Sequence, residues 1–184
     1  MKIVIVGSGR VGSVLAEAYD SAGHQVVILD LSARAFDRLP AEFQGAAVRG
    51  DGTDEDTLRR AGAADADVFL ALTEGDNRNV MAAQVASEKL EIRTVVAKIN
   101  DPVRAAAYAE LGIATMCRTT MQADAISAYL HLDALGLPGV IAPTGSHHGN
   151  GKHATVLAGA AGGPAGSGGG PGPTGAPLTS GREA

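Results

Sequence analysis

The chain has 184 residues, of which 45% are hydrophobic and 3% aromatic, and its formal net charge is −5. This length suits one domain with a single core, and the acidic balance argues against nucleic acid as a partner, because binding to its phosphates requires clustered lysine and arginine. The single cysteine excludes an internal disulfide, and neither a leader peptide nor an apolar run of the roughly 20 residues that span a bilayer is recognisable, which favours a cytoplasmic location.

Six short, mostly apolar runs alternate with helical patterns along residues 1–135. The predicted strands are Ile3–Val6, Gln25–Leu29, Ala46–Arg49, Val68–Leu72, Thr94–Lys98 and Ala114–Met116. Runs that are apolar without alternation are typical of a parallel sheet buried on both faces. We therefore predict an α/β fold, a Rossmann-like doubly wound parallel sheet, over this part of the chain.

Residues between the predicted strands are typical of helix caps. Ser32 precedes a short helical pattern, and Thr53 with Asp56 three residues later resembles a capping box. Asp101 followed by proline marks another helix start. Helix ends are predicted at Gly23, Gly62 and Gly112.

The turn after the first predicted strand carries the first candidate site. The sequence Gly7-Ser8-Gly9-Arg10-Val11-Gly12 follows KIVIV directly and opens a helical pattern. In such a motif Gly7 permits the tight turn, Gly9 lets the backbone approach a pyrophosphate, and Gly12 lets the helix pack closely on the strand. Because the amides of a first helical turn and the helix dipole hold phosphates, we predict that these six residues bind a nucleotide.

Asp30 supports this prediction from the end of the second predicted strand, 23 residues after Gly7. A carboxylate at that place can accept hydrogen bonds from both ribose hydroxyls and would repel a 2′-phosphate, which argues against NADPH. The alternative is a glycine turn that only joins strand to helix, with Asp30 as a solvated acid.

Polar residues also follow the third predicted strand, at the carboxyl edge where ligands of open α/β sheets bind. Here Asp51 could contact the adenine edge, next to Gly52, and Thr53 could cap the following helix. Ordinary turn chemistry explains the same residues equally well.

The fourth and fifth predicted strands end in further candidates at this edge. Thr73 could meet the phosphate and ribose side of a nucleotide, whereas Asp76 could be only a helix N-cap. Asn79 lies one helical turn further on. Lys98 could approach phosphates or could be an edge lysine with its head in water.

Three segments carry a resemblance to a known family. They are KIVIVGSGRVGSVLAEAYDSAGHQVVILD, VRGDGTDEDTLRRAGAADADVFLALTEGDNRNVMAAQVA and VVAKINDP. Together they resemble the N-lobe of the regulator-of-potassium-conductance family, also called the Trk-type nucleotide-binding or KTN domain. The shared motifs are the glycine turn, the strand-end Asp, G-D-x-T-D and T-x-x-D-x-x-N, of which an ordinary dehydrogenase has only the first two.

The resemblance implies a function. Such domains bind NAD(H) or adenine nucleotides and form cytoplasmic rings that gate a potassium channel or transporter in the membrane. NAD(H) is then the first expected ligand, and ATP or ADP the second. The resemblance also implies that Arg10 contacts the nucleotide of a neighbouring subunit, although a solvent-facing arginine is the alternative. A helix over Thr119 to Leu135 would cross onto that neighbour, or would pack on its own domain.

The rest of the chain bears on the choice between enzyme and regulator. Residues 138–184 hold 14 of the 25 glycines and 6 of the 8 prolines, so we expect residues 136–184 to be a disordered linker or tail. Such a segment cannot build the substrate wall of a dehydrogenase, which favours a non-catalytic regulator. The alternatives are a small NAD-dependent oxidoreductase, or a subunit of one, and a nucleotide-binding scaffold unrelated to ion transport.

We predict no catalytic residue and no metal site, and we assign no role to Cys117, His147, His148 or His153.

Overall fold

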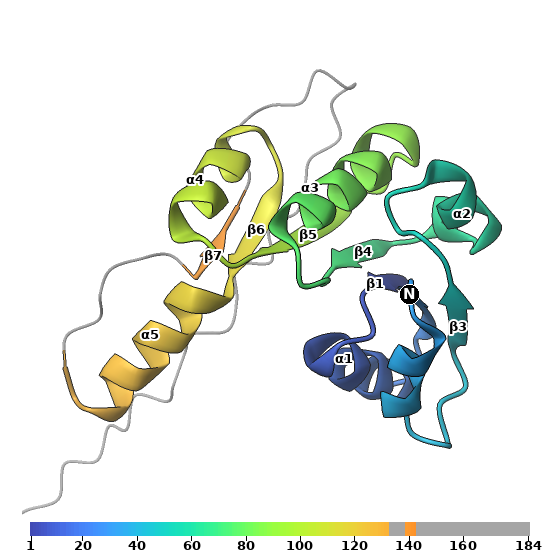
Figure 1. Ribbon diagram of the computed structural model, residues 1–184, viewed down its shortest axis with the longest axis horizontal. Coiled ribbons are helices and arrows are strands. Elements are labelled where there is room, and N and C mark those ends of the chain that lie inside the picture. The colour runs from blue at the N-terminus through green and yellow to red at the C-terminus, as the bar shows by residue number, and fades with distance from the viewer. Residues whose placement is uncertain (133–138, 143–184) are drawn as a thin grey trace, which may run out of the picture. The chain divides into compact units, whose positions relative to one another are not determined.

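A computed structural model describes residues 1–132 and 139–142, and its centre is a seven-stranded sheet (Figure 1). The strands are β1 (Lys2–Val6), β2 (Gln25–Asp30), β3 (Ala46–Arg49), β4 (Val68–Ala71), β5 (Thr94–Ile99), β6 (Ala114–Cys117) and β7 (Val140–Ile141). They are ordered β3-β2-β1-β4-β5-β6-β7, and all neighbours are parallel except β6 and β7. The strand order reverses between β1 and β4, which makes the carboxyl ends of these two strands the topological switch point. The predicted Rossmann-like fold is confirmed.

Helices connect the parallel strands. They are α1 (Arg10–Ser21), the 3₁₀ turn η1 (Ala33–Arg38), α2 (Glu55–Arg60), the 3₁₀ turn η2 (Ala63–Asp65), α3 (Asp76–Gln84) with its π-helical continuation η3 (Val85–Lys89), α4 (Pro102–Glu110) and α5 (Arg118–Tyr129). Among the described residues no helix is both long and apolar enough to cross a membrane.

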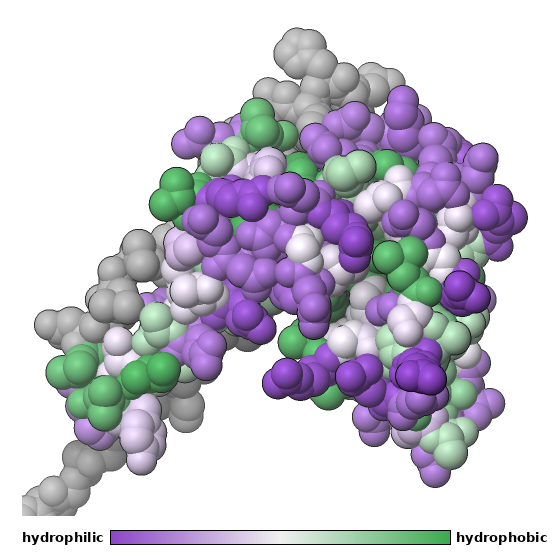
Figure 2. Space-filling model, viewed as in Figure 1, coloured by the Kyte–Doolittle hydropathy of each residue, from purple (hydrophilic) through white to green (hydrophobic). Residues whose placement is uncertain are grey.

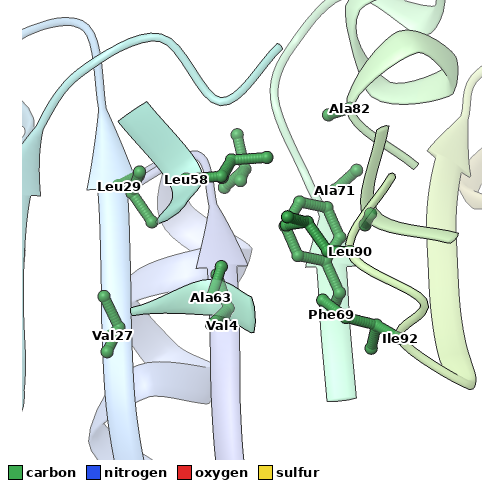
Figure 3. Close-up of a cluster of buried hydrophobic side chains, with 12 residues drawn as sticks. Val4, Val27, Leu29, Leu58, Ala63, Phe69, Ala71, Ala82, Leu90 and Ile92 are labelled. Atoms are coloured by element: carbon green, nitrogen blue, oxygen red, sulfur yellow. The ribbon is translucent and has the colours of Figure 1, made fainter. Parts of the chain in front are cut away.

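The two faces of the sheet bury different helices, because alternate residues of each strand point to opposite sides. On one face Ile3 and Ile5 of β1 pack with Ala16 of α1. On the other face Val4 of β1 packs with Leu58 of α2 and with residues of α3. Figure 3 shows this second cluster, in which Leu58 lies beside β1 and β2, and the ring of Phe69 lies beside Leu90 and Ile92.

The cap predictions had mixed outcomes. Gly23, Gly62 and Gly112 have positive φ angles at helix ends, as predicted, and the Asp101 carboxylate accepts hydrogen bonds from the amides of Val103 and Arg104. Ser32 is the N-cap residue of η1, as predicted, although its hydroxyl makes no capping hydrogen bond.

The predicted capping box at Thr53 and Asp56 is wrong. The N-cap of α2 is Asp54, whose Oδ2 accepts the amide of Thr57 at 2.9 Å. Thr53 instead donates its amide and its hydroxyl to Asp51 Oδ1. Two adjacent candidates, Thr53 and Asp54, both fit the cap preference, and only the backbone geometry selects between them.

Helix α5 carries its apolar side chains outward. Exposed apolar residues of α5 and the segment just after it are Met121, Ile126, Tyr129, Leu130 and Leu132. The buried side of α5 is polar, with Thr120 and Ser127. Figure 2 shows hydrophobic side chains gathered along this helix.

Strand β7 departs from the expected tail, because Val140 and Ile141 pair antiparallel with Met116 and Thr115 of β6. A Cβ at Gly139 would lie 2.5 Å from Met121 Cγ, so the glycine lets the chain pass close to α5 just before β7. A strand of two apolar residues within a Gly/Pro-rich stretch is too short to show a hydrophobic pattern, so the sequence does not predict it. The rest of the expected tail, including His147, His148 and His153, lies outside the described residues.

Candidate functional site

The glycine turn lies between β1 and α1 and has the tight geometry that its sequence predicts. Gly7 has a φ of +108°, and a Cβ there would lie 2.9 Å from the backbone of Leu72 and Thr73. A Cβ at Gly12 would lie 1.9 Å from the Gly7 carbonyl oxygen. Both positions therefore exclude any side chain, and the turn is held against the carboxyl end of β4.

Gly9 differs from these two glycines because a Cβ there would meet no atom within 4 Å. The open space lies directly at the N-terminus of α1, where Gly9 is the N-cap and no side chain caps the first turn among the described residues. Backbone amides and the positive end of a 12-residue helix face this space. A phosphate fits these donors.

Asp30 stands beside the turn at the end of β2. Its Oδ2 accepts the Ser8 amide at 2.9 Å, and its Oδ1 accepts the Ser32 amide at 2.9 Å. An ionised carboxylate has about four lone-pair sites, so two remain for further donors. These contacts place an acceptor with free capacity next to the N-terminus of α1, an arrangement that would suit ribose hydroxyls.

Ser8 takes a structural position within the turn. Its side chain is fully buried, and its hydroxyl donates to the Ala35 carbonyl of η1 at 3.1 Å. Since its amide is bound to Asp30, both of its donors are used inside the chain. Arg10 and Val11 are exposed at the first turn of α1, and Arg10 makes no ion pair within the described residues.

The loop after β3 approaches the turn from the other side. A Cβ at Gly52 would lie 2.2 Å from Val6 Cγ1, so this glycine packs against the end of β1. Asp51 Oδ1 accepts the amide and hydroxyl of Thr53 at 2.9 and 2.8 Å. This is the ordinary turn chemistry that the sequence left open, and Asp51 retains a second carboxylate oxygen.

Thr73 and Asn79 are bound to one another. Asn79 is fully buried, and its Oδ1 accepts both the amide and the hydroxyl of Thr73, at 2.8 and 2.6 Å. Its Nδ2 donates to the carbonyls of Thr73 and Lys98, at 3.0 and 2.8 Å. The amide and hydroxyl donors of Thr73 are therefore engaged within the chain.

Asp76 has a related role, and its interpretation as an N-cap is wrong. The N-cap of α3 is Gly75, and the Asp76 carboxylate instead accepts the backbone and side-chain N–H groups of Asn100, at 2.9 and 2.8 Å. Arg104 lies 3.9 Å from the same carboxylate. Together Thr73, Asp76, Asn79 and Asn100 form a polar clamp between the ends of β4 and β5. One acceptor within it, Asn100 Oδ1, is buried without a hydrogen-bond partner among the described residues.

Lys98 is the penultimate residue of β5, and its carbonyl oxygen accepts the Asn79 side chain of the clamp. Burial lowers the pKa of Lys98, and the charge of Arg118 lowers this pKa further, while Glu74 and Asp76 act in the opposite direction. Neither Asn100 nor Arg118 was a predicted site residue. The signal that could have found them is their position, since each directly follows a strand at the carboxyl edge.

The predicted site residues thus lie at one edge of the sheet, but they differ in how their hydrogen-bonding groups are used. The glycine turn keeps open space at Gly9, and Asp30 and Asp51 keep unused acceptor capacity. Thr73 and Asp76 are committed to the clamp. No group of three or more His, Cys, Asp or Glu within the described part of the chain could hold a metal ion.

Comparison with known proteins gives a family match. Residues 3–119 match the family model described as the TrkA-N domain. The "Trk system potassium uptake protein TrkA" of Streptomyces coelicolor is 47% identical over 124 residues, which cover 67% of this chain and 56% of that protein. A "TrkA homolog" of Pyrococcus abyssi is 31% identical over 111 residues, covering 60% and 49%. The chain therefore spans about half the length of these two relatives.

Solved structures share the fold at lower identity. The TrkA-N domain of the inner membrane protein ybaL from Escherichia coli is 22% identical with a TM-score of 0.63, covering 70% of this chain and 96% of that one. A Kef C-terminal domain from Shewanella denitrificans, in an AMP-bound form, is 22% identical with a TM-score of 0.59, covering 71% and 80%. These likenesses show the fold alone.

Proposed function

The chain belongs to the TrkA-N domain family, and from this premise we propose that it is a nucleotide-binding, non-catalytic regulatory component of a potassium-uptake system. The names of its relatives in Streptomyces coelicolor and Pyrococcus abyssi support the link to potassium uptake. We assign the nucleotide site to residues 1–135, the domain expected from the sequence.

The proposed ligand is an adenine nucleotide with a free 2′-hydroxyl, that is NAD(H), ATP or ADP. The first-turn amides of α1 and the Arg10 side chain of a neighbouring copy bind its phosphates, Asp30 accepts its ribose hydroxyls, and Asp51 faces its adenine. Ser8 holds Asp30 in position and does not contact the ligand. A 2′-phosphate would meet the charge of Asp30, so NADPH binds weakly.

One observation carries this proposal. The Asp30 carboxylate is bonded to the Ser8 amide at 2.9 Å, one residue before the open space at Gly9. The carboxylate proposed to accept the ribose and the turn proposed to hold the phosphates are therefore neighbours, which supports a nucleotide site.

The regulatory part of the proposal concerns assembly. The exposed apolar residues along α5 support self-association, because an apolar stripe of this kind needs a covering surface. In the proposed assembly, a dimer or larger ring, different nucleotides favour different orientations of paired domains. The coupling to an integral-membrane potassium channel or transporter is limited by the difference in nucleotide affinity between the two states. The chain would then lie at the inner face of the membrane through its partner.

Thermal unfolding of the full chain against NAD, NADH, NADPH, ATP and ADP tests the ligand. A ligand at about 100 times its dissociation constant stabilises the native state by about 2.7 kcal/mol, which is readily seen as a higher midpoint. We expect this shift with an adenine nucleotide, little shift with NADPH, and its loss in Asp30→Ala. Asp65→Ala removes an exposed carboxylate on η2 and is the matched control.

Two outcomes would contradict the proposal. No shift with any nucleotide would leave the glycine turn a structural turn. Steady oxidation of NADH with a carbonyl substrate would instead make the chain an oxidoreductase. Copurification of a potassium transporter subunit with the tagged chain tests the partner, and its absence at every nucleotide condition would contradict the regulatory role.

A further inference from the structure

The first turn of α5 is fastened to the end of β5 by two residues, Asn100 and Thr119. Thr119 is exposed, and its hydroxyl donates to the Asn100 carbonyl oxygen at 2.6 Å. We propose that Asn100 and Thr119 are positioning residues, which set the direction of α5 according to the conformation of residues 73–76 beside the glycine turn. This inference rests on the proposed nucleotide-regulated assembly and names the contact through which the nucleotide acts on α5.

The direction of α5 is sensitive to its first turn. Thr119 bonds to Asn100 there, and Met121 lies close to Gly139 just before β7. Toward the end of the helix Tyr129 is 84% exposed, and Figure 1 shows α5 leading away from the end of β6. A helix of 12 residues is about 18 Å long, so a tilt of about 10° at its start moves its end by about 3 Å.

The position of Asn100 is itself set by the segment between β4 and α3. Its backbone amide and its Nδ2 donate to Asp76 Oδ1 at 2.9 and 2.8 Å, and Nδ2 also donates to the Glu74 carbonyl oxygen at 3.3 Å. The acceptor of the Thr119 hydroxyl belongs to the main chain of the same residue. A shift of residues 73–76 therefore moves the group to which α5 is fastened.

The same segment touches the glycine turn on its other side. A Cβ at Gly7 would lie 2.9 Å from the Leu72 carbonyl carbon and 2.9 Å from the Thr73 nitrogen. Residues 73–76 thus lie between the turn that is proposed to hold the phosphates and Asn100. Closely packed groups pass on a small displacement because they cannot deform continuously, so a change at the turn reaches Asn100 through this segment.

Two features of Asn100 favour a second arrangement. Its Oδ1 is buried without a hydrogen-bond partner in the described part of the chain, and an unpaired buried acceptor costs free energy. Rotation of the side chain away from Asp76 would return this oxygen to water. The Asn100 carbonyl also accepts the Cys117 thiol at 3.7 Å, so it keeps a donor when Thr119 leaves. The clamped arrangement therefore has a competitor, as a switching element requires.

Pulsed electron paramagnetic resonance on the full chain tests this link. Nitroxide labels at Asp65→Cys and Ala128→Cys, two exposed positions, report the distance between η2 and the end of α5. Cys117 is 1% exposed and so stays unlabelled, and dilution with unlabelled chains restricts the signal to distances within one chain. We expect a narrow distance distribution without nucleotide and a shift of that distribution with whichever of ATP, ADP, AMP and NADH binds.

Variants of the two positioning residues separate the link from binding. Thr119→Val keeps the side-chain shape without the hydroxyl, so it should broaden the distribution and abolish the nucleotide-dependent shift. Thr119→Ser keeps the hydroxyl and should preserve both. Asn100→Ala releases the main chain from Asp76 and should lose the shift. The Thr119 variants should still bind nucleotide, seen as a rise in melting midpoint. Thr94→Val, at an exposed threonine that begins β5, is the matched control and should change nothing.

Three results would overturn the link. They are a wild-type distribution and shift in Thr119→Val, the same losses in Thr119→Ser as in Thr119→Val, and a bound nucleotide that leaves the wild-type distance unchanged. Failure of the proposed function gives a different result, because no nucleotide would then raise the melting midpoint. In that case the nucleotide-free distributions of wild type and Thr119→Val still show whether the hydroxyl sets the direction of α5.

Discussion

At the carboxyl ends of β1, β2 and β3, polar groups keep hydrogen-bonding capacity, whereas at the ends of β4 and β5 most of them satisfy one another. Asp30 and Asp51 each use only part of their carboxylates, and the space at Gly9 is open. Asn79, by contrast, uses both its oxygen and its nitrogen inside the chain. The two halves of this sheet edge therefore differ in role. The ends of β1, β2 and β3 keep free hydrogen-bond acceptors and open space, whereas the polar groups at the ends of β4 and β5 hold the loops in place.

This difference teaches how to interpret polar residues at such an edge. A polar side chain whose partners all come from its own chain supports geometry, and its loss costs stability. A side chain that keeps free acceptors, such as Asp30 or Asp51, can accept further donors as well, so its removal should also change ligand binding. Substitutions in the two halves should thus separate folding from binding.

The largest expected effect is that of Asn79→Leu. The substitution leaves the Thr73 amide and the carbonyls of Thr73 and Lys98 without their partner, so it should lower the free energy of unfolding by about 3 kcal/mol. Urea denaturation measures this loss. Asn77→Leu, at an exposed position of the same helix, is the control and should cost far less. An Asn79→Leu variant that stays stable but no longer binds AMP would show that Asn79 acts in ligand binding and not in stability.

A smaller effect is expected from Asp54→Ala, which separates the cap of α2 from Asp51, the residue proposed to contact the adenine. Hydrogen bonds from the Thr57 hydroxyl and amide lower the pKa of Asp54 below its ordinary value of 3.8. The stabilisation is therefore complete above that value and is lost as the pH falls through the lowered pKa. The variant should have a lower melting temperature at pH 7 and nearly the wild-type one in strong acid. AMP affinity should not change, whereas Asp51→Ala should weaken it.

The smallest expected effect is a gain in stability on replacing Lys98, not a loss. Burial lowers the pKa of Lys98 from 10.5, so the folded state disfavours its charge. Lys98→Met should slightly raise the stability of the protein without nucleotide at neutral pH. Between the lowered pKa and 10.5 the unfolded chain binds more protons than the folded one, so wild-type stability gains on the variant as the pH rises. Denaturation series at pH 7 and pH 10 measure the difference, and destabilisation by Lys98→Met would make Lys98 a structural residue.

The fold was predictable because its signals are local. Apolar runs between glycine and aspartate punctuation gave the six parallel strands, and the glycine spacing gave a turn in which Gly7 and Gly12 have no room for a side chain. The polar clamp was not predictable in the same way. The sequence shows Thr73, Asp76 and Asn79, but the partner of Asp76 is Asn100, which only the pairing of β4 with β5 brings near.

Asp30 has a consequence for the thermodynamics of recognition. Both of its oxygens are oriented by amides of its own neighbourhood, Ser8 and Ser32, so the rotamer is fixed by the fold. A side chain that is already fixed loses little conformational entropy when it accepts another hydrogen bond. The carboxylate is therefore preorganised, and most of the free energy from its contact with a ribose would go into affinity.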